Sequence, residues 1–365
     1  MARQLGYRLL VVLLLSHLTY AVERHVPDDY ATIQAAIDAA GNGDIVIIAD
    51  GTYTGDGNRD IDFLGKAITV RSANGPEVCI INCQGYEDDS HRGFVFQTGE
   101  TERSILEGVT IENGYILSSE DVGGGAIFCE NGSPRIQECI VRNNTVYGYE
   151  ARGGGLLCSN GSSPIVSNST FISNRVTFTF SGGGFGGGGI CCVDSSSLQM
   201  NDCEITENSA IASSSANGGG IYTEGYETVF PRPSIELRRC VIKSNAVAAR
   251  SGEGGRARGG GVCSVYGNMT LIDCTVSENT VNYSVGEAMR NSGEGGGIFL
   301  YCGTATIATS RISNNFASGK DYQGDFNGAG GGLCSGLCAL TMANCVISGN
   351  TANGGRGGGV AALGN

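Results

Sequence analysis

A short pattern of polar and apolar positions recurs along most of the chain. Each copy begins with cysteine or serine, carries Ile, Val or Phe two places later, and ends with asparagine. The seven copies are Cys139–Asn144, Ser169–Asn174, Cys203–Asn208, Cys240–Asn245, Cys274–Asn279, Ser310–Asn315 and Cys345–Asn350. Successive asparagines are 30, 34, 37, 34, 36 and 35 residues apart. This period predicts a solenoid built from one repeated structural unit.

The alternation within each copy is typical of a β-strand. Cys203 and Ile205 would share one face of the strand, while Asp202, Glu204 and Thr206 would point to the other. The segments are too short and too β-branched for helices. A propeller blade needs four strands in about 40 residues, whereas the pattern indicates three short ones. We therefore expect an all-β parallel β-helix with three strands and three turns per coil.

Stacking of such coils explains which residue types recur. Equivalent positions would lie about 4.8 Å apart in neighbouring coils, so the apolar residue of each copy joins a continuous interior column. The asparagines would form a ladder at a turn, with each amide bonded to the next coil and tolerating unusual backbone angles. A glycine cluster before each copy would permit turns and close backbone approach. The clusters begin at Gly124, Gly153, Gly187, Gly218, Gly259, Gly295 and Gly330, and an eighth at Gly357 opens a coil that the sequence does not complete.

The first third of the chain lacks this template. Arg3 and Arg8 precede a short apolar run, Leu9 to Leu15, and Ala21 offers a cleavage site, as in an export signal. Residues 32–40 have the pattern of a short helix that would cap the open end of the apolar interior. We therefore expect a signal peptide at 1–21, a cap with the first irregular coils at 22–122, and about seven regular coils, the last incomplete, at 123–365.

Composition narrows the range of partners. The chain has 60 glycines and 15 cysteines, and 41% hydrophobic residues is too rich for disorder. The formal charge is -13, and loss of the signal with its two arginines would make it -15. Such a charge repels phosphate, so we expect no nucleic acid and no anionic lipid as partner. No segment after the signal approaches the roughly 20 apolar residues of a membrane span. We therefore expect a secreted protein, either extracellular or on the outer cell surface.

Two stretches resemble known families. Val26 to Ser72 resembles the opening of pectin lyase-like β-helix proteins, through Ala31-TIQAAIDAA, Gly43-DIVIIADGTYTG and Lys66-AITVRS. The later copies resemble exported bacterial proteins with right-handed β-helix repeats and the passenger repeats of chlamydial polymorphic outer membrane proteins. Their GGA[ILV] and FxxN motifs match Gly124-GAI and Phe171-ISN. The resemblance spans 26–365 and implies a single-stranded right-handed parallel β-helix, a fold that hosts lyases, hydrolases, esterases, adhesins and phage spikes.

One surface gathers residues that could perform catalysis. The register places Asp202 and Glu204 on one coil, Arg239 and Lys243 on the next, and Asp273 on the one after, all facing outward. The resemblance to polysaccharide lyases implies acidic calcium ligands and a base that removes a proton, and calcium is expected only in that case. Ion pairs on a solvated face are the simpler interpretation. We therefore assign no catalytic site and expect no metal or other cofactor.

Two further polar segments contain acid–base groups. His91 lies among the residues of Asp88–Arg92, and Asp60 and Asp62 lie in a similar turn-like segment. Both segments have the composition of ordinary polar loops between strands. The Gly-His-Gly and Asn-Thr-Asp motifs that the resemblance would imply for a hydrolase are absent.

The cysteines follow the repeat. Five of them, Cys139, Cys203, Cys240, Cys274 and Cys345, recur at the first position of the copy, where a small apolar thiol packs well. The spacing of Cys334 and Cys338 is compatible with a zinc site, but interior packing is the simpler account. Stacked neighbours are close enough to be oxidised, and an odd total leaves at least one free thiol. We expect mostly buried thiols, some disulfides and no metal.

The segments after the ladder asparagines differ in length and would all emerge on one flank. Insertions on one face usually mark the binding face of a solenoid. Flat aromatic rings among hydroxyls and amides suit sugar rings or a protein partner. The aromatic residues expected to bind are Tyr147, Tyr149, Phe178, Phe180, Tyr283, Tyr322 and Phe326.

These observations favour a non-enzymatic β-helix protein that adheres to, or binds, a glycan or a surface protein through this flank. The alternative is a polysaccharide lyase or glycoside hydrolase acting on acidic polysaccharide. A third hypothesis is a passenger fragment of a larger surface protein. An open last coil would expose apolar residues and strand edges, so end-to-end association is also expected there.

Overall fold

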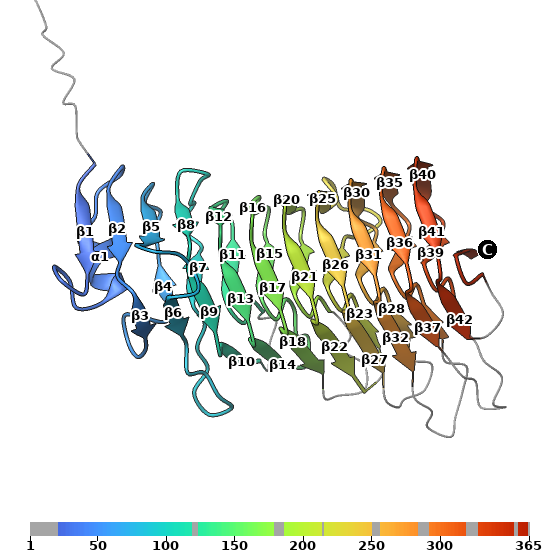
Figure 1. Ribbon diagram of the computed structural model, residues 1–365, viewed down its shortest axis with the longest axis horizontal. Helices are drawn as coiled ribbons and strands as arrows, with labels where there is room; N and C mark the ends of the chain where they lie inside the picture. The colour runs from blue at the N-terminus through green and yellow to red at the C-terminus, as the bar shows by residue number, and fades with distance from the viewer. Residues whose placement is uncertain are drawn as a thin grey trace, which may run out of the picture.

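A computed structural model describes residues 21–118, 123–178, 186–213, 215–249, 256–283, 292–318, 328–353 and 357–363. The expected signal peptide, apart from Ala21, lies outside these residues. The described chain is an all-β, right-handed parallel solenoid with one short helix near its N-terminal end (Figure 1). Strands of successive coils pair in parallel and in register, so each position of the repeat forms a row along the solenoid axis.

The strands form five sheets, which we name A to E. Sheet A contains β1 (Glu23–Val26), β2 (Ile45–Ile48), β5 (Thr69–Ser72), β8 (Ile105–Glu107), β12 (Arg135–Gln137), β16 (Ile165–Ser167), β20 (Ser197–Asn201), β25 (Ser234–Arg238), β30 (Asn268–Ile272), β35 (Thr304–Ala308) and β40 (Ala339–Ala343). Sheet B contains β3 (Gly51–Tyr53), β6 (Cys79–Asn82), β9 (Thr110–Glu112), β13 (Ile140–Arg142), β17 (Thr170–Ile172), β21 (Glu204–Thr206), β26 (Val241–Lys243), β31 (Thr275–Ser277), β36 (Arg311–Ser313) and β41 (Val346–Ser348). Sheet C contains β4 (Ile61–Asp62), β7 (Phe94–Phe96), β11 (Ile127–Glu130), β15 (Leu156–Ser159), β19 (Ile190–Val193), β24 (Ile221–Glu224), β29 (Val262–Val265), β34 (Ile298–Tyr301), β39 (Leu333–Gly336) and β43 (Val360–Leu363).

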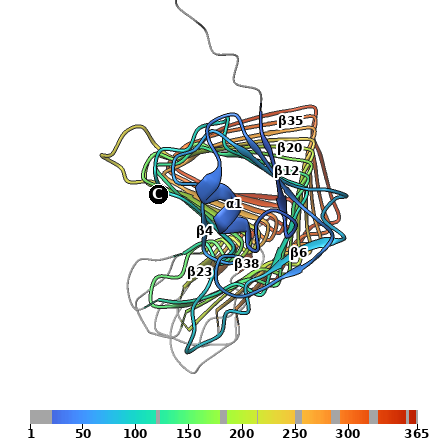
Figure 2. The ribbon, with the colours of Figure 1, turned by 90° about the vertical axis from the view of Figure 1, so that its left-hand side faces the viewer.

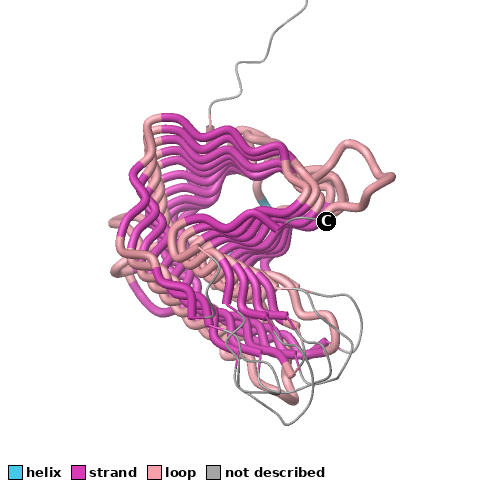
Figure 3. Tube along the Cα trace, turned by 90° about the vertical axis from the view of Figure 1, so that its right-hand side faces the viewer, coloured by secondary structure: helices cyan, strands magenta, loops and turns pink. Residues whose placement is uncertain are grey.

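Two more sheets form an arm beside the main coil. Sheet D contains β10 (Tyr115–Ser118), β14 (Thr145–Gly148), β18 (Arg175–Phe178), β22 (Ser209–Ala212), β27 (Ala246–Ala249), β32 (Thr280–Tyr283), β37 (Phe316–Ser318) and β42 (Thr351–Asn353). Sheet E contains β23 (Ala216–Asn217), β28 (Arg256–Arg258), β33 (Ser292–Glu294) and β38 (Gly328–Ala329). Figure 3 shows this arm as a second, smaller stack of strands beside the main outline.

The arm corrects the expectation of three strands per coil. The segment after each ladder asparagine begins as a strand, because its second residue is a buried valine or alanine, as in Val146, Val247 and Val281. In the described residues, the coils before β10 have the expected three strands, and later coils have four, or five where they contain β23, β28, β33 or β38. The expected interior column is confirmed, since Val141, Phe171 and Ile205 and their equivalents as far as Ile312 are fully buried, and Ile347 on the last of these coils is partly buried.

Three apolar clusters hold these layers together. The largest fills the interior enclosed by sheets A, B and C. A second lies within the arm and includes Val176, Phe178 and Ala257. A third lies on the opposite face of sheet C and includes Leu157, Tyr222 and Phe299. Sheet C is therefore covered on both faces.

The asparagine ladder is confirmed, with one correction. The amide of each ladder asparagine donates to Oδ1 of the next, as between Asn208 and Asn245 at 3.0 Å and between Asn245 and Asn279 at 3.0 Å. The left-handed backbone falls on the preceding residue, for example Glu207 at φ 56 and Ser244 at φ 55. The ladder asparagine is buried and its side chain hydrogen-bonds to the neighbouring coils. The positive φ of the turn is adopted by the residue before it.

The capping helix is also confirmed. Helix α1 spans Ile33–Ala39, and the Thr32 hydroxyl caps it by accepting from the Ala35 backbone N–H. Ile33, Ala36 and Ile37 are buried in the same cluster as the solenoid interior. Figure 2, seen along the axis from the N-terminal side, shows α1 lying across the end of the coil.

Candidate functional site

The expected acid–base surface lies at the turn between sheets A and B. Asp202, Arg239 and Asp273 occupy equivalent positions on three successive coils, with φ values of 56, 53 and 55. Arg239 binds the Asp202 carboxylate through two hydrogen bonds, Nε–Oδ1 at 2.7 Å and Nη2–Oδ2 at 2.8 Å. This pairing lowers the pKa of Asp202 and raises the pKa of Arg239, and the charge of Asp273 adds to the second effect. Asp202 is therefore held as a carboxylate by its partner.

Of the other two residues of that prediction, Glu204 lies beside this pair in the same surface depression, whereas Lys243 does not line it. Glu204 is the register partner of Val241, whereas Lys243 is aligned with Thr206. The Lys243 ammonium pairs instead with Glu278 of the following coil at 3.5 Å. The shallow depression of about 430 Å³ at this turn is open to solvent and contains the Asp202–Arg239 pair on its surface. Its one basic side chain, Arg239, is bound to Asp202, and Glu204 is a second acid in its lining. The Asp202–Arg239 arrangement has the form of an ion-pair row.

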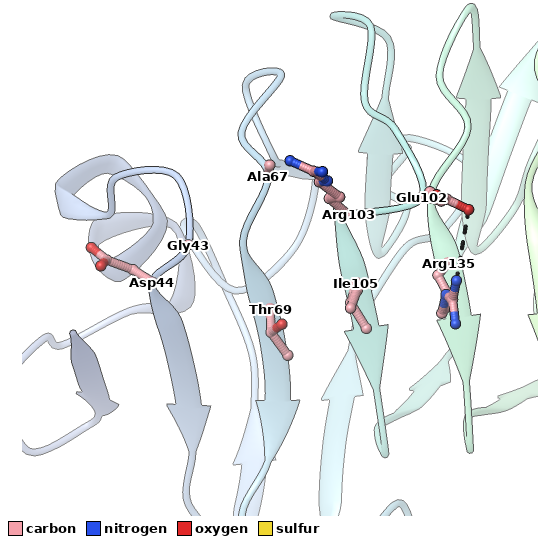
Figure 4. A pocket seen from close by; sticks show the side chains of 8 residues that line it. All are labelled: Gly43, Asp44, Ala67, Thr69, Glu102, Arg103, Ile105 and Arg135. Carbon is pink, nitrogen blue, oxygen red and sulfur yellow. Dashed lines mark ion pairs between the residues drawn. The ribbon is translucent and has the colours of Figure 1, made fainter. Parts of the chain in front are cut away.

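A second depression crosses the outer face of sheet A near the N-terminal end (Figure 4). Its volume is about 410 Å³, and Glu102 and Arg135 form an ion pair of 3.8 Å at one side. Its lining comprises Gly43, Asp44, Ala67, Thr69, Glu102, Arg103, Ile105 and Arg135.

Asp44, the other acid of this depression, fastens β1 to the cap. Its carboxylate accepts from the backbone of Gly41 at 2.9 Å and of Val22 at 3.0 Å, and from Arg24 at 2.7 Å. The Gly41 N–H contributes most to lowering the pKa of Asp44. Both oxygens of the Asp44 carboxylate accept hydrogen bonds within the fold, so Asp44 is a poor candidate for catalysis on a ligand.

The structure unites two polar segments that are far apart in the sequence. His91 lies between two carboxylates, with Nδ1 at 2.5 Å from Asp60 Oδ2 and Nε2 at 2.9 Å from Asp89 Oδ1. The backbone of His91 exchanges two hydrogen bonds of 2.9 Å with Tyr115 of β10. Both imidazole nitrogens are engaged, and the cluster fastens the 84–92 loop along the first strand of sheet D. Covering this edge prevents pairing with other chains.

The aromatic residues expected on the flank have different positions. Tyr147 lies half-buried on sheet D and Tyr149 is exposed just beyond it. Phe178 is only 2% exposed and packs inside the arm, so its side chain is not on the binding surface. It follows the alternation of β18, in which Val176 and Phe178 point inward. Phe180, Tyr322 and Phe326, and the side chain of Tyr283, lie outside the described residues.

Sequence reasoning missed a cluster on another corner of the solenoid. The connection 225–233 carries Tyr226, Val229 and Phe230, all exposed, beside Tyr266 and Tyr301 of the following coils. One signal could have found it, because the repeat containing it has the longest spacing, 37 residues between Asn208 and Asn245.

All fifteen cysteines are thiols in the structure, twelve of them buried, so the expected disulfides are not present. Cys203, Cys240 and Cys274 stack on successive coils, and a hydrogen bond from Cys240 lowers the pKa of Cys203. Among the described residues, no group of three or more His, Cys, Asp or Glu side chains is placed to hold a metal ion. No helix in the described part of the chain is long and apolar enough to span a membrane.

Comparison with known proteins identifies the family. The family described as "Right handed beta helix region" matches residues 44–230, just over half of the chain. The protein therefore belongs to the right-handed β-helix family. No curated protein sequence matches the chain.

Solved structures with a related course of the chain include several enzymes. Pectate lyase Pel9A is 17% identical, with 89% of this chain and 77% of that one covered and a TM-score of 0.46. The catalytic domain of a GH87 α-1,3-glucanase in complex with nigerose is 11% identical, with 91% and 66% covered and a TM-score of 0.41. The A-module of the Azotobacter vinelandii mannuronan C-5 epimerase AlgE6 is 13% identical, with 91% and 94% covered and a TM-score of 0.31. We draw no functional conclusion from likenesses at this level.

Proposed function

We propose that the protein is an exported recognition protein, which binds a glycan or a surface protein through the outer face of sheet D. The observation that carries the proposal is a patch of apolar and aromatic side chains at the N-terminal end of this sheet. Leu117 and Tyr147 are register partners on adjacent coils, and Tyr149 follows just beyond the strand. Leu117 and Tyr149 are each 44% exposed.

The setting of this patch supports recognition. Tyrosine offers a flat apolar ring with a polar end, which suits both sugar rings and protein surfaces. The arm backbone beneath it is rigid, because β10 and β14 pair in parallel and Val146 packs in the arm core. The edge of the sheet is fastened by the His91 cluster, so the patch is presented on an ordered surface.

The candidate catalytic residues support the same choice over the alternative. A lyase or hydrolase needs a base or a pair of carboxylates that can face a substrate. Arg239 is bound to Asp202 and Lys243 to Glu278, all on open surface. A polysaccharide lyase or glycoside hydrolase remains the competing function, and calcium would belong only to that one.

Binding of the purified chain to a glycan array and to a panel of surface proteins tests the proposal. We expect binding that the pair of substitutions Tyr147→Ala and Tyr149→Ala abolishes. Val78→Ala is the control, because Val78 is 42% exposed, close to the exposure of Leu117 and Tyr149, and precedes β6 of sheet B. Equal binding by the double variant and the wild type would refute the assignment to sheet D.

A further inference from the structure

An insertion lengthens the corner between sheets C and A in one of the regular coils. The connection from β24 to β25 runs over 225–233, whereas those of the coils before and after it run over only 194–196 and 266–267. Figure 2 shows it as the yellow loop that projects from the solenoid. Phe230 is 70% exposed and Tyr226 is 53% exposed on it. Burying apolar surface normally stabilises a fold. Exposed aromatic rings on an insertion that the neighbouring coils lack therefore indicate a binding role.

The insertion is anchored to the next coils. The Arg232 guanidinium lies 5.3 Å from the ring centre of Phe230 and 5.9 Å from that of Tyr266, and its Nη1 donates to the Cys302 carbonyl at 3.1 Å. The Tyr266 ring packs edge-on against Tyr301 at 5.9 Å between centres. The backbone adds two bonds of 2.9 Å, from Gly225 to Val265 and from Asn268 to Pro233. A ligand bound here would therefore meet a preorganised loop.

A pocket of about 190 Å³ lies between the insertion and the two preceding coils. Asn160 comes from one of these coils, and Asp194 and Ser195 come from the other. The insertion supplies Gly225, Tyr226, Val229, Pro231 and Pro233. The pocket thus has a mostly apolar wall, from Tyr226, Val229 and two prolines of the insertion. A polar wall comes from Asn160, Asp194 and Ser195, whose groups include donors as well as acceptors. Its volume is below the usual range for drug-sized ligands, so it suits one ring.

We propose that this pocket binds one neutral sugar residue of a glycan. A pyranose presents an apolar face of C–H groups together with hydroxyl donors around its rim, which matches the two walls. A hydroxyl that donates to the Asp194 carboxylate would form a charge-assisted hydrogen bond.

Charge argues for a neutral sugar over an acidic one. Asp194 lines the pocket, and Glu224 and Glu227 lie on or beside the insertion. Burial raises the pKa of Glu224 and the charge of Asp194 adds to this, while the hydrogen bond with Tyr222 and the charge of Arg152 lower it. The nearest described cation on the insertion, Arg232, is engaged by two rings and a carbonyl. A uronate or phosphate ligand would be repelled here.

This site is separate from the patch on sheet D, because it lies at the corner between sheets C and A. We would titrate the full chain calorimetrically with cellohexaose, laminarihexaose and trigalacturonate. The variants are Tyr226→Ala and Asp194→Asn, and Asn tolerates the left-handed backbone of Asp194 at φ 51. Tyr86→Ala is the matched control for this site, because Tyr86 is an exposed tyrosine between β6 and β7 of an early coil.

We expect a neutral hexasaccharide to bind. Each variant should weaken binding about tenfold or more, the effect of losing one strong hydrogen bond or ring contact, with an unchanged thermal midpoint. Unaltered affinity in both variants, preference for trigalacturonate, or no binding of either neutral sugar would overturn the inference. Loss of binding in the Tyr147 and Tyr149 variant alone would overturn it while supporting the sheet D proposal, so the two can fail separately.

Discussion

Replacing one ladder asparagine should destabilise the solenoid far more in its middle than near its last described coil. The Asn245 side chain makes four hydrogen bonds. Its Nδ2 donates to Ile205 O at 2.8 Å and to Asn279 Oδ1 at 3.0 Å, and its Oδ1 accepts from the backbone and side chain of Asn208, both at 3.0 Å. The residue is fully buried, so water cannot replace these partners in Asn245→Ala. At about 1 kcal/mol for each bond, the loss is about 4 kcal/mol.

Asn350→Ala is the matched control. Asn350 makes three equivalent bonds, donating to Ile312 O at 2.9 Å and accepting from the backbone and side chain of Asn315, both at 2.9 Å. Asn350 is only half-buried, so water would satisfy part of what the substitution exposes. We expect a loss of about 1–2 kcal/mol.

Urea unfolding followed by circular dichroism measures both changes. Hydrogen exchange should accompany it, because solenoids can unfold in parts and the transition need not be two-state. Asn245→Ala should lower the midpoint clearly more than Asn350→Ala and release amide protection around β26 and β27. Equal, small shifts in both variants would refute the view that the buried ladder holds the coils together.

Three further predictions follow from the packing, the cap and the thiols. Gly219→Ala should destabilise the folded protein by about 1–3 kcal/mol, because a Cβ there would lie 2.5 Å from the carbonyl oxygens of Ala246 and Gly260. The control is Gly41→Ala, whose Cβ would have no atom nearer than 3.9 Å, and it should leave the melting temperature within error. The lowered pKa of Asp44, caused first by the Gly41 N–H, means that folding favours the carboxylate. Asp44→Asn should therefore melt below the wild type at neutral pH, and the two should converge as the pH falls below the ordinary Asp value of 3.8; a constant difference in acid would contradict this. Burial raises the pKa of Cys139 to about 12, so this thiol should react slowly near neutral pH. Mass spectrometry after brief alkylation of the native protein should find label chiefly on the half-buried cysteines Cys302, Cys338 and Cys345. Fast labelling of buried cysteines would contradict the packing.

Much of the fold could be predicted because the repeated sequence pattern indicates which residues of successive coils are aligned. The interior position held by Ile205 and its equivalents, the ladder asparagines and the helix at Ile33–Ala39 all follow from alternation and spacing alone. The arm could not be predicted so readily. Of the two inward positions of β14, Val146 carries an apolar side chain and Gly148 carries none. One apolar side chain in a short segment carries little periodic signal.

The candidate sites were harder, because they depend on contacts between coils. Alignment predicted that Asp202, Arg239 and Asp273 stack, and the turn does place them in one row. Alignment did not predict that Glu204 and Lys243 are not register partners. Glu204 is aligned with Val241, and Lys243 is aligned with Thr206, two residues further along the strand. The pocket at 225–233 could not be predicted from the sequence, because its polar wall comes from Asn160 and Asp194, on coils that precede the insertion.

The central claim is recognition without turnover, and one measurement tests it directly. The purified chain would be incubated with each polysaccharide that it binds, with and without calcium, and the products followed by reducing ends and by the ultraviolet absorbance of unsaturated sugars. The account predicts a bound and unchanged polymer. Release of oligosaccharides that depends on the protein would contradict it, and its loss in Asp202→Ala, Lys243→Ala or Asp194→Asn would show which surface performs the chemistry.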